Sequence, residues 1–492
     1  MEKIPNYIIK ILTDLEKSGF EAYLVGGCVR DFLRGKNPVD WDVTTSAKPE
    51  EILKIFPDAK YENDFGTVML PIKYLVENYS DEMGNLGVVE ITTYRIESKY
   101  SDKRHPDKVK FAKTLEEDLS RRDFTVNALA LEIGKNNFNV VDLFDGQEDL
   151  KKKIIRAIGK ADDRFNEDAL RMMRAVRFSV QLNFTIEKNT FEAIKKNAKN
   201  LKFVSQERIR DELIKIILSD RPAEGINLLF ETGLLKFIIP EIIEGYDVTQ
   251  SRHHYHGPYN TVYKHLLAAL SKCPSKKMEV RLASLLHDIG KPQTKRGHGE
   301  TATFHSHEYA GARITKKILE RLRFSRETID KVHLLVYNHM FYYNVDEVGE
   351  SGVRRVVQKV GLENINDLID VRIADRLGSG VPKAVPYKLR HFKFMVEKVS
   401  NDPISVKQLK LNGTDLMVKL KMKPGPKIGA ILDILLAMVI DNPKQNTKIK
   451  LLELARDLNK EDTSSLKKQA KKRIEAERQK DERLMKKKYW VE

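Results

Sequence analysis

Two short segments near the start of the sequence carry residue types that suit phosphate chemistry. Gly26 and Gly27 stand between an apolar run and Arg30, and the carboxylates Asp40 and Asp42 follow, separated by one residue. A glycine pair at a strand-to-helix turn lets backbone N–H groups approach a phosphate without a Cβ in the way. Carboxylates two positions apart on a strand share one face and suit two divalent metals about 4 Å apart. The two segments together predict metal-dependent nucleotidyl transfer.

The elements that must position these residues follow from the pattern of the chain. Residues 1–19 predict a helix that ends at Gly19, and a short helix is expected from Arg30. The predicted strands are residues 21–25, 39–44, 67–72 and 88–94. This α/β block closes near residues 142–146, and the strand signals nearly vanish after residue 148. Helical periodicity then predicts helices over 162–181, 190–199, 206–219 and 222–232.

A third motif lies further along the chain and completes a recognisable set. Residues 121–128 read Arg-Arg-Asp-Phe-Thr-Val-Asn-Ala, after Gly-Gly-Cys-Val-Arg-Asp at 26–31 and Asp-Trp-Asp at 40–42. In this order and spacing the motifs resemble the class II tRNA nucleotidyltransferase and poly(A) polymerase family, within the DNA polymerase β superfamily. The resemblance covers residues 20–215 well and the remainder more loosely. It implies an α+β fold, with a polymerase-β-like head (a small mixed sheet with helices) followed by all-α neck, HD and tail domains.

The resemblance also implies which residues hold the metals and the nucleotide. Asp40 and Asp42 are expected to ligate two Mg²⁺ ions, which prefer oxygen ligands. Glu90 is a candidate third catalytic carboxylate, although an ordinary glutamate at a strand edge explains it equally well. The residues expected to contact the triphosphate or the ribose are Gly27, Arg30 and Arg122.

The helix predicted over 162–181 carries the residues expected to read the base. Asp168 and Arg171 lie three positions apart and can face one target, or form a salt bridge on a wet face. Arg171, Arg174 and Arg177 form a ladder of one sign, which favours ligand binding. In the resembling family this helix selects the incoming base, and Arg174 and Arg177 would assist through ribose or phosphate. Cytosine and adenine both present an amine donor beside a ring-nitrogen acceptor, which a carboxylate and a guanidinium match.

The polar segment 95–107 predicts a mobile loop close to this site. In family members that add C, C and A, a loop here helps the site to change from CTP to ATP. The leading interpretation is therefore an enzyme that adds CCA to tRNA 3′ ends, with tRNA, CTP and ATP as its partners. A poly(A) polymerase or a partial CC- or A-adding enzyme is the alternative, and a protein that is mainly an HD-domain phosphohydrolase is a further one.

A second set of residues resembles the HD domain of metal-dependent phosphohydrolases. Its members, in the order His…His-Asp…Asp, are His265, His287, Asp288 and Asp375. Two imidazoles and two carboxylates suit a transition metal such as Mn²⁺, Fe²⁺, Ni²⁺ or Zn²⁺. His307 and His339 are candidates for a second metal. HD domains usually hydrolyse phosphoesters with a metal-activated water, so the resemblance implies either a second, phosphohydrolase activity or a scaffold with slight activity.

Composition sets the outer bounds of these expectations. The chain has 492 residues and a formal net charge of +16, which favours a polyanionic partner such as RNA. Two cysteines, Cys28 and Cys273, exclude a disulfide framework. The sequence predicts a cytoplasmic protein without a membrane span, and it leaves the oligomeric state open. The predicted domains are the head (1–146), a helical neck with the base-reading helix (147–258), an HD domain (259–380), a helical RNA-binding tail (381–459) and a basic polar arm (460–492).

Overall fold

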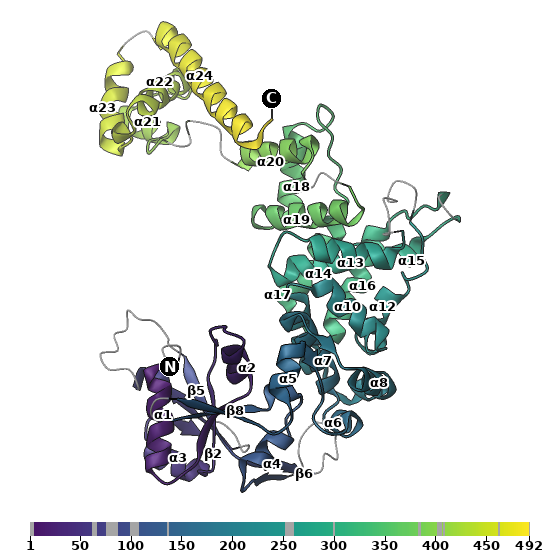
Figure 1. Cartoon of the computed structure of the whole chain (residues 1–492). Coiled ribbons are helices and arrows are strands. Elements are labelled where there is room, and N and C mark those ends of the chain that lie inside the picture. The colour runs from purple at the N-terminus through teal and green to yellow at the C-terminus, as the bar shows by residue number, and fades with distance from the viewer. Residues whose placement is uncertain are drawn as a thin grey trace. The chain divides into compact units, whose positions relative to one another are not determined.

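The protein is seen in a computed structural model. It describes residues 4–61, 66–74, 87–98, 108–134, 137–250, 260–298, 301–381, 385–400, 406, 409–460 and 463–491. The chain divides into two compact units (Figure 1). The first unit comprises Met1–Tyr337 with Ala374–Gly380, and the second comprises Asn338–Ile373 with Val381–Glu492.

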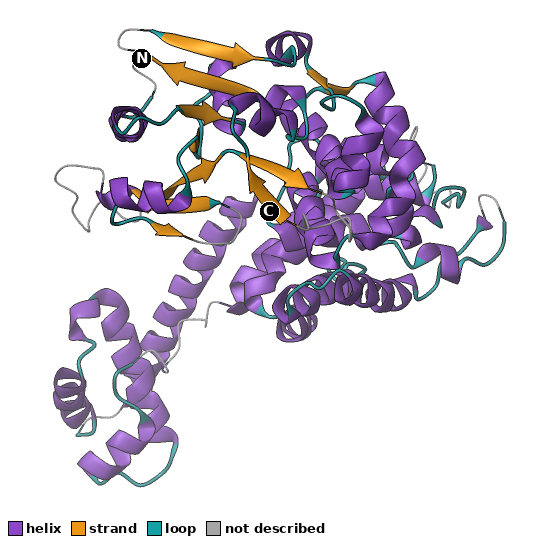
Figure 2. Ribbon diagram, turned by 90° about the horizontal axis from the view of Figure 1, so that it is seen from below, coloured by secondary structure: helices purple, strands orange, loops and turns teal. Residues whose placement is uncertain are grey.

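A seven-stranded mixed sheet forms the head, with strand order β3-β4-β5-β2-β1-β8-β9. The strands are β1 (Ala22–Val25), β2 (Asp42–Thr45), β3 (Lys60–Tyr61), β4 (Thr67–Pro71), β5 (Val88–Thr93), β8 (Leu129–Ile133) and β9 (Phe138–Asp142). The pairing of β2 with β5 is parallel, and the other pairings are antiparallel. Figure 2 shows the strands gathered in the head, whereas the rest of the chain is mainly helical. The predicted α+β fold class is therefore confirmed.

The sheet is stabilised by apolar side chains from helix α1 (Asn6–Lys17) and helix α3 (Pro49–Ile55). The side chains that α1 buries are Ile8, Ile11, Leu12 and Leu15, the spacing of one helical face. Gly19 follows the helix with φ +90°, as expected for a residue beyond a helix end.

The predicted strands agree with the sheet except at one important point. β2 begins at Asp42, so the prediction of a strand over 39–44 is wrong in its first half. Val39 is 93% exposed, and Asp40 lies in an exposed bend before the strand. Pro38 and the absence of packing around Val39 explain why pairing starts late. β8 was not predicted, because its sequence Leu-Ala-Leu-Glu-Ile has only one β-branched residue, Ile133 at its end, whereas such residues mark most strands.

The single helix predicted over 162–181 is two helices. Helix α6 (Ala161–Glu167) ends before Asp168, and helix α7 (Leu170–Leu182) begins after it. Asp168 has extended backbone angles, φ −136° and ψ 105°, and its Oδ1 accepts a hydrogen bond from the Leu170 N–H at 3.1 Å. An aspartate that bonds a nearby backbone N–H competes with the helical hydrogen bond, which explains the break.

Other helices follow the predicted ranges closely. They are α8 (Lys188–Asn197), α9 (Gln206–Ile217) and α10 (Pro222–Glu231). Further along the first unit lie α13 (Val262–Lys272), α14 (Met278–Leu286) and α16 (His307–Arg321), and α17 (Arg326–Asn338) ends at the beginning of the second unit. Among the described helices, none combines the length and the apolar character needed to cross a membrane.

The second unit is built from helices. They are α18 (Glu350–Val360), most of α19 (Leu362–Gly378), α20 (Tyr387–Ser400), α21 (Gly413–Leu420), α22 (Pro426–Asp441), α23 (Lys448–Leu458) and α24 (Thr463–Tyr489). The predicted basic arm forms α24, whose Ala470 and Ile474 are buried in the apolar core with Leu435 and Leu451. The arm is therefore a packed helix along part of its length.

Candidate active site

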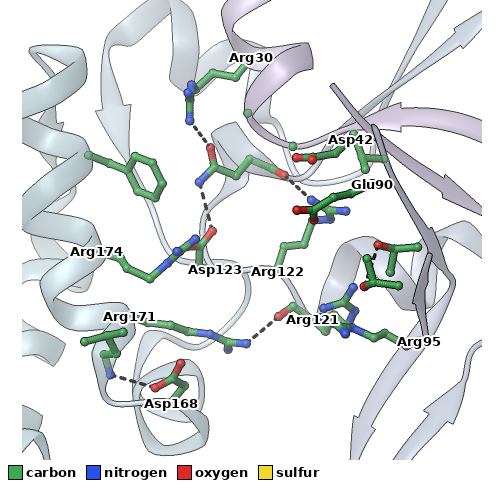
Figure 3. Close-up of a pocket in the computed structure, with 18 of the residues that line it drawn as sticks. Arg30, Asp42, Glu90, Arg95, Arg121, Arg122, Asp123, Asp168, Arg171 and Arg174 are labelled. Carbon is green, nitrogen blue, oxygen red and sulfur yellow. Dashed lines mark hydrogen bonds and ion pairs between the residues drawn. The ribbon is translucent and has the colours of Figure 1, made fainter. Parts of the chain in front are cut away.

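The cavity that contains the predicted nucleotide-binding residues lies in the head and the adjoining neck, and has a volume of about 510 Å³ (Figure 3). Seven arginines line it: Arg30, Arg95, Arg121, Arg122, Arg171, Arg174 and Arg208. Four acidic residues line it as well: Asp42, Glu90, Asp123 and Asp168. Excess positive charge in a concave site favours a polyanion such as a triphosphate.

The glycine pair shapes the wall of this cavity beside the arginines. Helix α2 (Gly27–Leu33) begins at Gly27, earlier than the predicted start at Arg30. Gly26 has φ +80°, and a Cβ added there would lie 2.9 Å from Arg122 Nη1 and 3.8 Å from Asp42 Oδ2. The backbone angle therefore favours glycine at position 26, and a Cβ there would displace the Arg122 guanidinium.

Asp42 and Glu90 face the cavity from neighbouring strands. They are direct partners in the parallel register of β2 and β5, so both side chains leave the same face of the sheet. Burial raises the pKa of the Asp42 carboxyl; Arg122 opposes the rise and Asp40 adds to it. A cavity-facing set of carboxylate oxygens fits a hard divalent cation such as Mg²⁺.

Asp40 differs from the prediction in its surroundings. It is exposed, it precedes the strand, and it is not among the described residues that line the cavity. The expectation that Asp40 and Asp42 share one face of a strand is therefore wrong, because the strand starts at Asp42. Asp40 nevertheless lies close enough to raise the pKa of Asp42. Its role as a metal ligand stays a prediction.

Asp118, in helix α4 (Leu115–Ser120), orients two of the arginines. Its carboxylate is fully buried and accepts from Arg121 Nη2 at 2.8 Å and from Arg122 Nη2 at 3.4 Å. It also accepts from the backbone N–H of Arg95, at 3.3 Å, in strand β6 (Arg95–Ser98). Burial raises the pKa of Asp118, but the positive charges of Arg121 and Arg122 lower it by more, so the pKa lies below its ordinary value. The sequence alone suggested no role for this residue.

A chain of hydrogen bonds connects α2 to α7 across the cavity. Arg30 Nη1 donates to Asn127 Oδ1 at 2.7 Å, and Asn127 Nδ2 donates to Asp123 Oδ1 at 3.2 Å (Figure 3). Arg174 Nε then donates to Asp123 Oδ2 at 2.7 Å. Burial raises the pKa of Asp123, but the charge of Arg174 and the hydrogen bond from Asn127 lower it by more, so the pKa lies below its ordinary value. Asp123 and Asn127 were not predicted as site residues, although both belong to the Arg-Arg-Asp-Phe-Thr-x-Asn motif that signals the family.

The two residues expected to read the base lie at the junction of α6 and α7, and both line the cavity. Arg208 of α9 holds Asp168 through two bonds, Nη2 to Oδ2 at 2.7 Å and Nη1 to Oδ1 at 3.3 Å. Arg171 donates to Glu167 Oε2 at 2.6 Å and to the backbone oxygen of Arg121 at 2.9 Å. Arg208 was missed, because nothing in the helical pattern of residues 206–219 distinguishes it.

The rest of the predicted arginine ladder divides between two environments. Arg174 lines the cavity, whereas Arg177 is not among the described residues that line the cavity. Arg177 Nη1 instead lies 3.2 Å from Glu212 Oε1, and its guanidinium lies 4.2 Å from the centre of the Phe178 ring. Burial lowers the pKa of Arg177 to about 10. A direct contact between Arg177 and the nucleotide remains a prediction that this placement does not favour.

The four residues of the predicted HD site come together in the first unit. His265 Nε2 lies 3.0 Å from His287 Nε2, 3.2 Å from Asp288 Oδ2 and 3.4 Å from Asp375 Oδ1. His287 Nε2 lies 3.3 Å and 3.6 Å from the same two carboxylate oxygens. His287 Nδ1 lies 2.9 Å from the Ser284 carbonyl, a bond that fixes the ring and leaves Nε2 for a ligand. Two nitrogens and two oxygens at these spacings fit one transition-metal ion.

A lysine and a third histidine complete the surroundings of Asp288. Lys291 Nζ lies 2.6 Å from Asp288 Oδ2 and donates to Gln250 Oε1 at 2.7 Å. His307 Nε2 lies 3.1 Å from Asp288 Oδ1. Burial lowers the pKa of His287, but Asp288 and Asp375 raise it by more, so the pKa lies above its ordinary value. His339 is buried in the second unit, and its part in a second metal site stays a prediction.

Comparison with known families gives three matches along the chain. Residues 22–156 match a family described as "Poly A polymerase head domain", and residues 183–245 match "Probable RNA and SrmB- binding site of polymerase A". Residues 262–379 match the HD domain family. The cavity residues up to Asn127 lie in the first match, Arg208 lies in the second, and His265, His287, Asp288 and Asp375 lie in the third.

Comparison with individual proteins gives matches of different extent. The CCA-adding enzyme of Lactococcus lactis is 34% identical over 457 residues, which cover 91% of this chain and 96% of the relative. The CCA-adding enzyme of Ligilactobacillus salivarius is 47% identical over 243 residues, so the chain spans only 56% of that relative's length. The crystal structure of the Bacillus stearothermophilus CCA-adding enzyme in complex with CTP superimposes with a TM-score of 0.57 at 25% identity. That superposition covers 93% of this chain and 98% of that one.

Proposed function

Because the chain belongs to the family of CCA-adding enzymes, we propose that it adds C, C and A, from CTP and ATP, to the 3′ ends of tRNA without a template. The observation that carries this proposal is one cavity lined by two kinds of residue. Asp42 and Arg122 are suited to phosphate transfer, and Asp168 and Arg171 are suited to reading a base. A tRNA substrate makes the cytoplasm the expected place of action.

In the head, the carboxylates and the arginine have different roles toward the triphosphate. Asp42 and Glu90, together with Asp40, would hold Mg²⁺. When bound, Mg²⁺ supplies charge neutralisation of the triphosphate and activation of the attacking 3′-hydroxyl. Arg122 carries positive charge beside Asp42, and buried Asp118 holds its guanidinium in place. The absence of a Cβ at Gly26 leaves room for the Arg122 guanidinium.

Base selection is assigned to Asp168 and Arg171. The Asp168 carboxylate accepts from the exocyclic amine of cytosine or adenine, and the Arg171 guanidinium donates to the adjacent ring nitrogen. Guanine and uracil present a carbonyl and an N–H at these positions, so both contacts would be lost. A buried polar group left unpaired costs about 1–3 kcal/mol, which is enough to exclude the wrong nucleotide.

The segment expected to help the change from CTP to ATP is described only in part. Residues 95–98 form β6, which pairs with β7 (Lys108–Phe111), so the prediction of a mobile loop over 95–107 is wrong for its first four residues. Residues 99–107 lie outside the described residues. The choice of full CCA addition over partial or poly(A) addition therefore rests on family membership.

The test is incorporation into tRNA that lacks its CCA end, with Mg²⁺ and with CTP and ATP supplied singly or together. We expect two CMP residues from CTP alone, then one AMP when ATP is present, and then a stop. Long A tails would favour a poly(A) polymerase and overturn the proposal, as would no incorporation. Asp42→Asn is the control variant, because it keeps the base-reading residues and removes a carboxylate needed for transfer.

The second candidate function is phosphoester hydrolysis by the HD site, favoured by the convergence of His265, His287, Asp288 and Asp375. When bound there, a transition metal supplies Lewis acidity toward a phosphoester. Lys291, beside Asp288, adds a positive charge that favours an anionic substrate, such as a cyclic phosphate at a damaged RNA end. Protein with Ni²⁺ or Mn²⁺ should release phosphate monoesters from nucleoside 2′,3′-cyclic phosphates. Release that survives Asp288→Asn would exclude this site as its source.

A further inference from the structure

The two tryptophans of the chain lie in opposite environments. Trp41, between Asp40 and Asp42, is 7% exposed, whereas Trp490, just after helix α24, is 78% exposed. Tryptophan is the largest aromatic side chain, and leaving it in water forfeits the burial that usually stabilises it. The exposure of Trp490 therefore leaves a large aromatic ring available to a ligand.

The backbone around Trp490 holds the side chain in this exposed position. Trp490 has φ +53°, its N–H donates to the Lys487 carbonyl at 3.2 Å, and the Val491 N–H donates to the Lys486 carbonyl at 2.9 Å. This is the hydrogen-bond pattern of a Schellman helix end, in which the left-handed residue is usually glycine. Val491 is buried and serves as its apolar anchor. A bulky residue in the left-handed region is strained, and such strain is commonly kept for function.

Ion pairs fix the end of α24 to α20 within the second unit. Lys488 Nζ lies 2.9 Å and 2.8 Å from the two carboxylate oxygens of Glu397. Lys398 Nζ lies 2.9 Å from Glu482 and 3.3 Å from Glu350, so one α20 lysine connects α24 to α18 as well. Trp490 therefore projects from a braced helix end.

The charge around Trp490 indicates what covers it. Helix α24 carries eleven Lys and Arg against four Asp and Glu, and Arg483 and Lys487 near its end are exposed. Basic side chains beside an exposed aromatic ring are the combination that binds unpaired nucleic acid, with the ring under a base and the cations on phosphates. An anionic membrane is less suited, because such helices need a free apolar stripe and α24 buries Ala470 and Ile474 in its own domain.

We propose that Trp490 is a stacking platform for an unpaired base of the RNA substrate, and that Lys487 contacts the adjacent phosphate. The proposal rests on the proposed function only in taking tRNA as the RNA. It adds a contact to RNA in the second unit, on elements that do not contribute to the catalytic cavity.

The experiment is a titration of the full chain with tRNA lacking CCA, in which binding is measured by intrinsic tryptophan fluorescence. Stacking should quench the emission of Trp490, and the quenching should be absent in Trp490→Leu. We expect Trp490→Leu to weaken tRNA binding about tenfold, the size of a base–aromatic stack, and Trp490→Phe to retain most of the affinity. Lys487→Gln should reduce the salt dependence of binding. Leu484→Ala is the matched control, since Leu484 is 59% exposed on the same helix and should not matter.

The outcomes separate this proposal from the proposed function. Normal tRNA affinity in Trp490→Leu, with CCA addition intact, would overturn the platform alone. Failure of the unmodified protein to bind tRNA would overturn the proposed function and the platform together. Binding of phosphatidylglycerol vesicles that depends on Trp490, with no effect of Trp490 on tRNA binding, would assign the surface to membranes and overturn the platform. Trp490→Gly should raise the unfolding temperature by relieving the left-handed strain while weakening tRNA binding, which a merely structural residue would not do.

Discussion

Arg208 holds the carboxylate of Asp168 with both ends of its guanidinium, the closer contact being 2.7 Å between Nη2 and Oδ2. The arginine comes from α9, and the aspartate occupies the break between α6 and α7. Because the Leu170 N–H also donates to Oδ1, three of the four lone-pair sites of the carboxylate are occupied, and the remaining one points in one direction. The geometry with which Asp168 would meet a base therefore depends on a residue outside the recognised motifs.

Arg208→Met should loosen nucleotide choice while sparing the chemical step. Without the paired bonds, Asp168 can rotate, so we expect KM for CTP and ATP to rise about tenfold and UMP incorporation to increase, with kcat changed much less. Arg210→Met is the matched control, because Arg210 lies on the same helix, is similarly exposed, and pairs with Asp211 and the Arg323 carbonyl instead.

Asp168→Ala provides the reference for that measurement, since it removes the carboxylate itself. It should abolish discrimination against UTP and GTP. If Asp168→Ala discriminates normally, the assignment of base reading is wrong. If only Arg208→Met behaves normally, the positioning role of Arg208 is wrong and the assignment of Asp168 stands.

Gly26→Ala should reduce transfer far more than it reduces stability. The added Cβ would meet Arg122 Nη1 at 2.9 Å, so the guanidinium must leave its place beside Asp42. The backbone angles of Gly26, φ 80° and ψ −132°, lie outside the regions open to alanine, which adds a stability cost of about 1–3 kcal/mol. Urea unfolding and CMP incorporation measure the two effects, and Gly35→Ala is a control with a positive φ and no atom within 4 Å of the added Cβ. Equal losses of activity in both variants would contradict the steric argument.

Asp118→Asn should destabilise the protein near neutral pH and progressively less in acid. The folded protein holds the pKa of Asp118 below its ordinary value, so the carboxylate stabilises the fold above a pH of about 4. That contribution disappears as the pH falls through the lowered pKa and the carboxylate takes up its proton. Urea unfolding from pH 7 down to pH 3 should show a gap of about 2 kcal/mol between wild type and variant that narrows toward the acid end. A gap independent of pH would show that lost packing, rather than charge, is responsible.

Addition of Mn²⁺ or Ni²⁺ should raise the unfolding temperature through the HD site. A ligand at a hundred times its Kd stabilises by about 2.7 kcal/mol, and His265→Asn should remove that effect. The folded protein raises the pKa of His287, so a metal must displace a proton and binding should strengthen as the pH rises. Asp42→Asn should keep the response, because Asp42 belongs to the other site. Stabilisation that survives His265→Asn would place the metal elsewhere.

The sequence was most informative where function requires contiguous residues. The motifs, whose spacing is set by a turn and a strand, predicted which residues surround one cavity: Gly26, Gly27, Asp42 and Arg122. Two of the HD ligands, His287 and Asp288, were found for the same reason, whereas His265 and Asp375 were found from their order along the chain. Strand β8 was missed because it is made of helix-favouring residues that become a strand through pairing on both sides.

The predictions that failed depended on local competition or on distant partners. Asp168 was placed inside a helix, because periodicity does not show that its side chain bonds the Leu170 N–H instead. Asp40 was placed on a strand that begins at Asp42. Arg208 acts through a contact with Asp168, which is distant in the sequence, and a single sequence does not show such pairs. Asp118 has local arginine partners, but its bond to the Arg95 backbone depends on a distant strand.

The break at Asp168 places the residues proposed for base choice on different elements from the residues proposed to hold the metal. The carboxylates Asp42 and Glu90 belong to the central strands of the sheet, whereas the residues assigned to base choice surround a joint between two helices. A mutant library confined to residues 164–171 would therefore explore new nucleotide preferences without disturbing the sheet. Under the proposed assignment, nucleotide choice could be engineered at this joint while the carboxylates of the sheet stay unchanged.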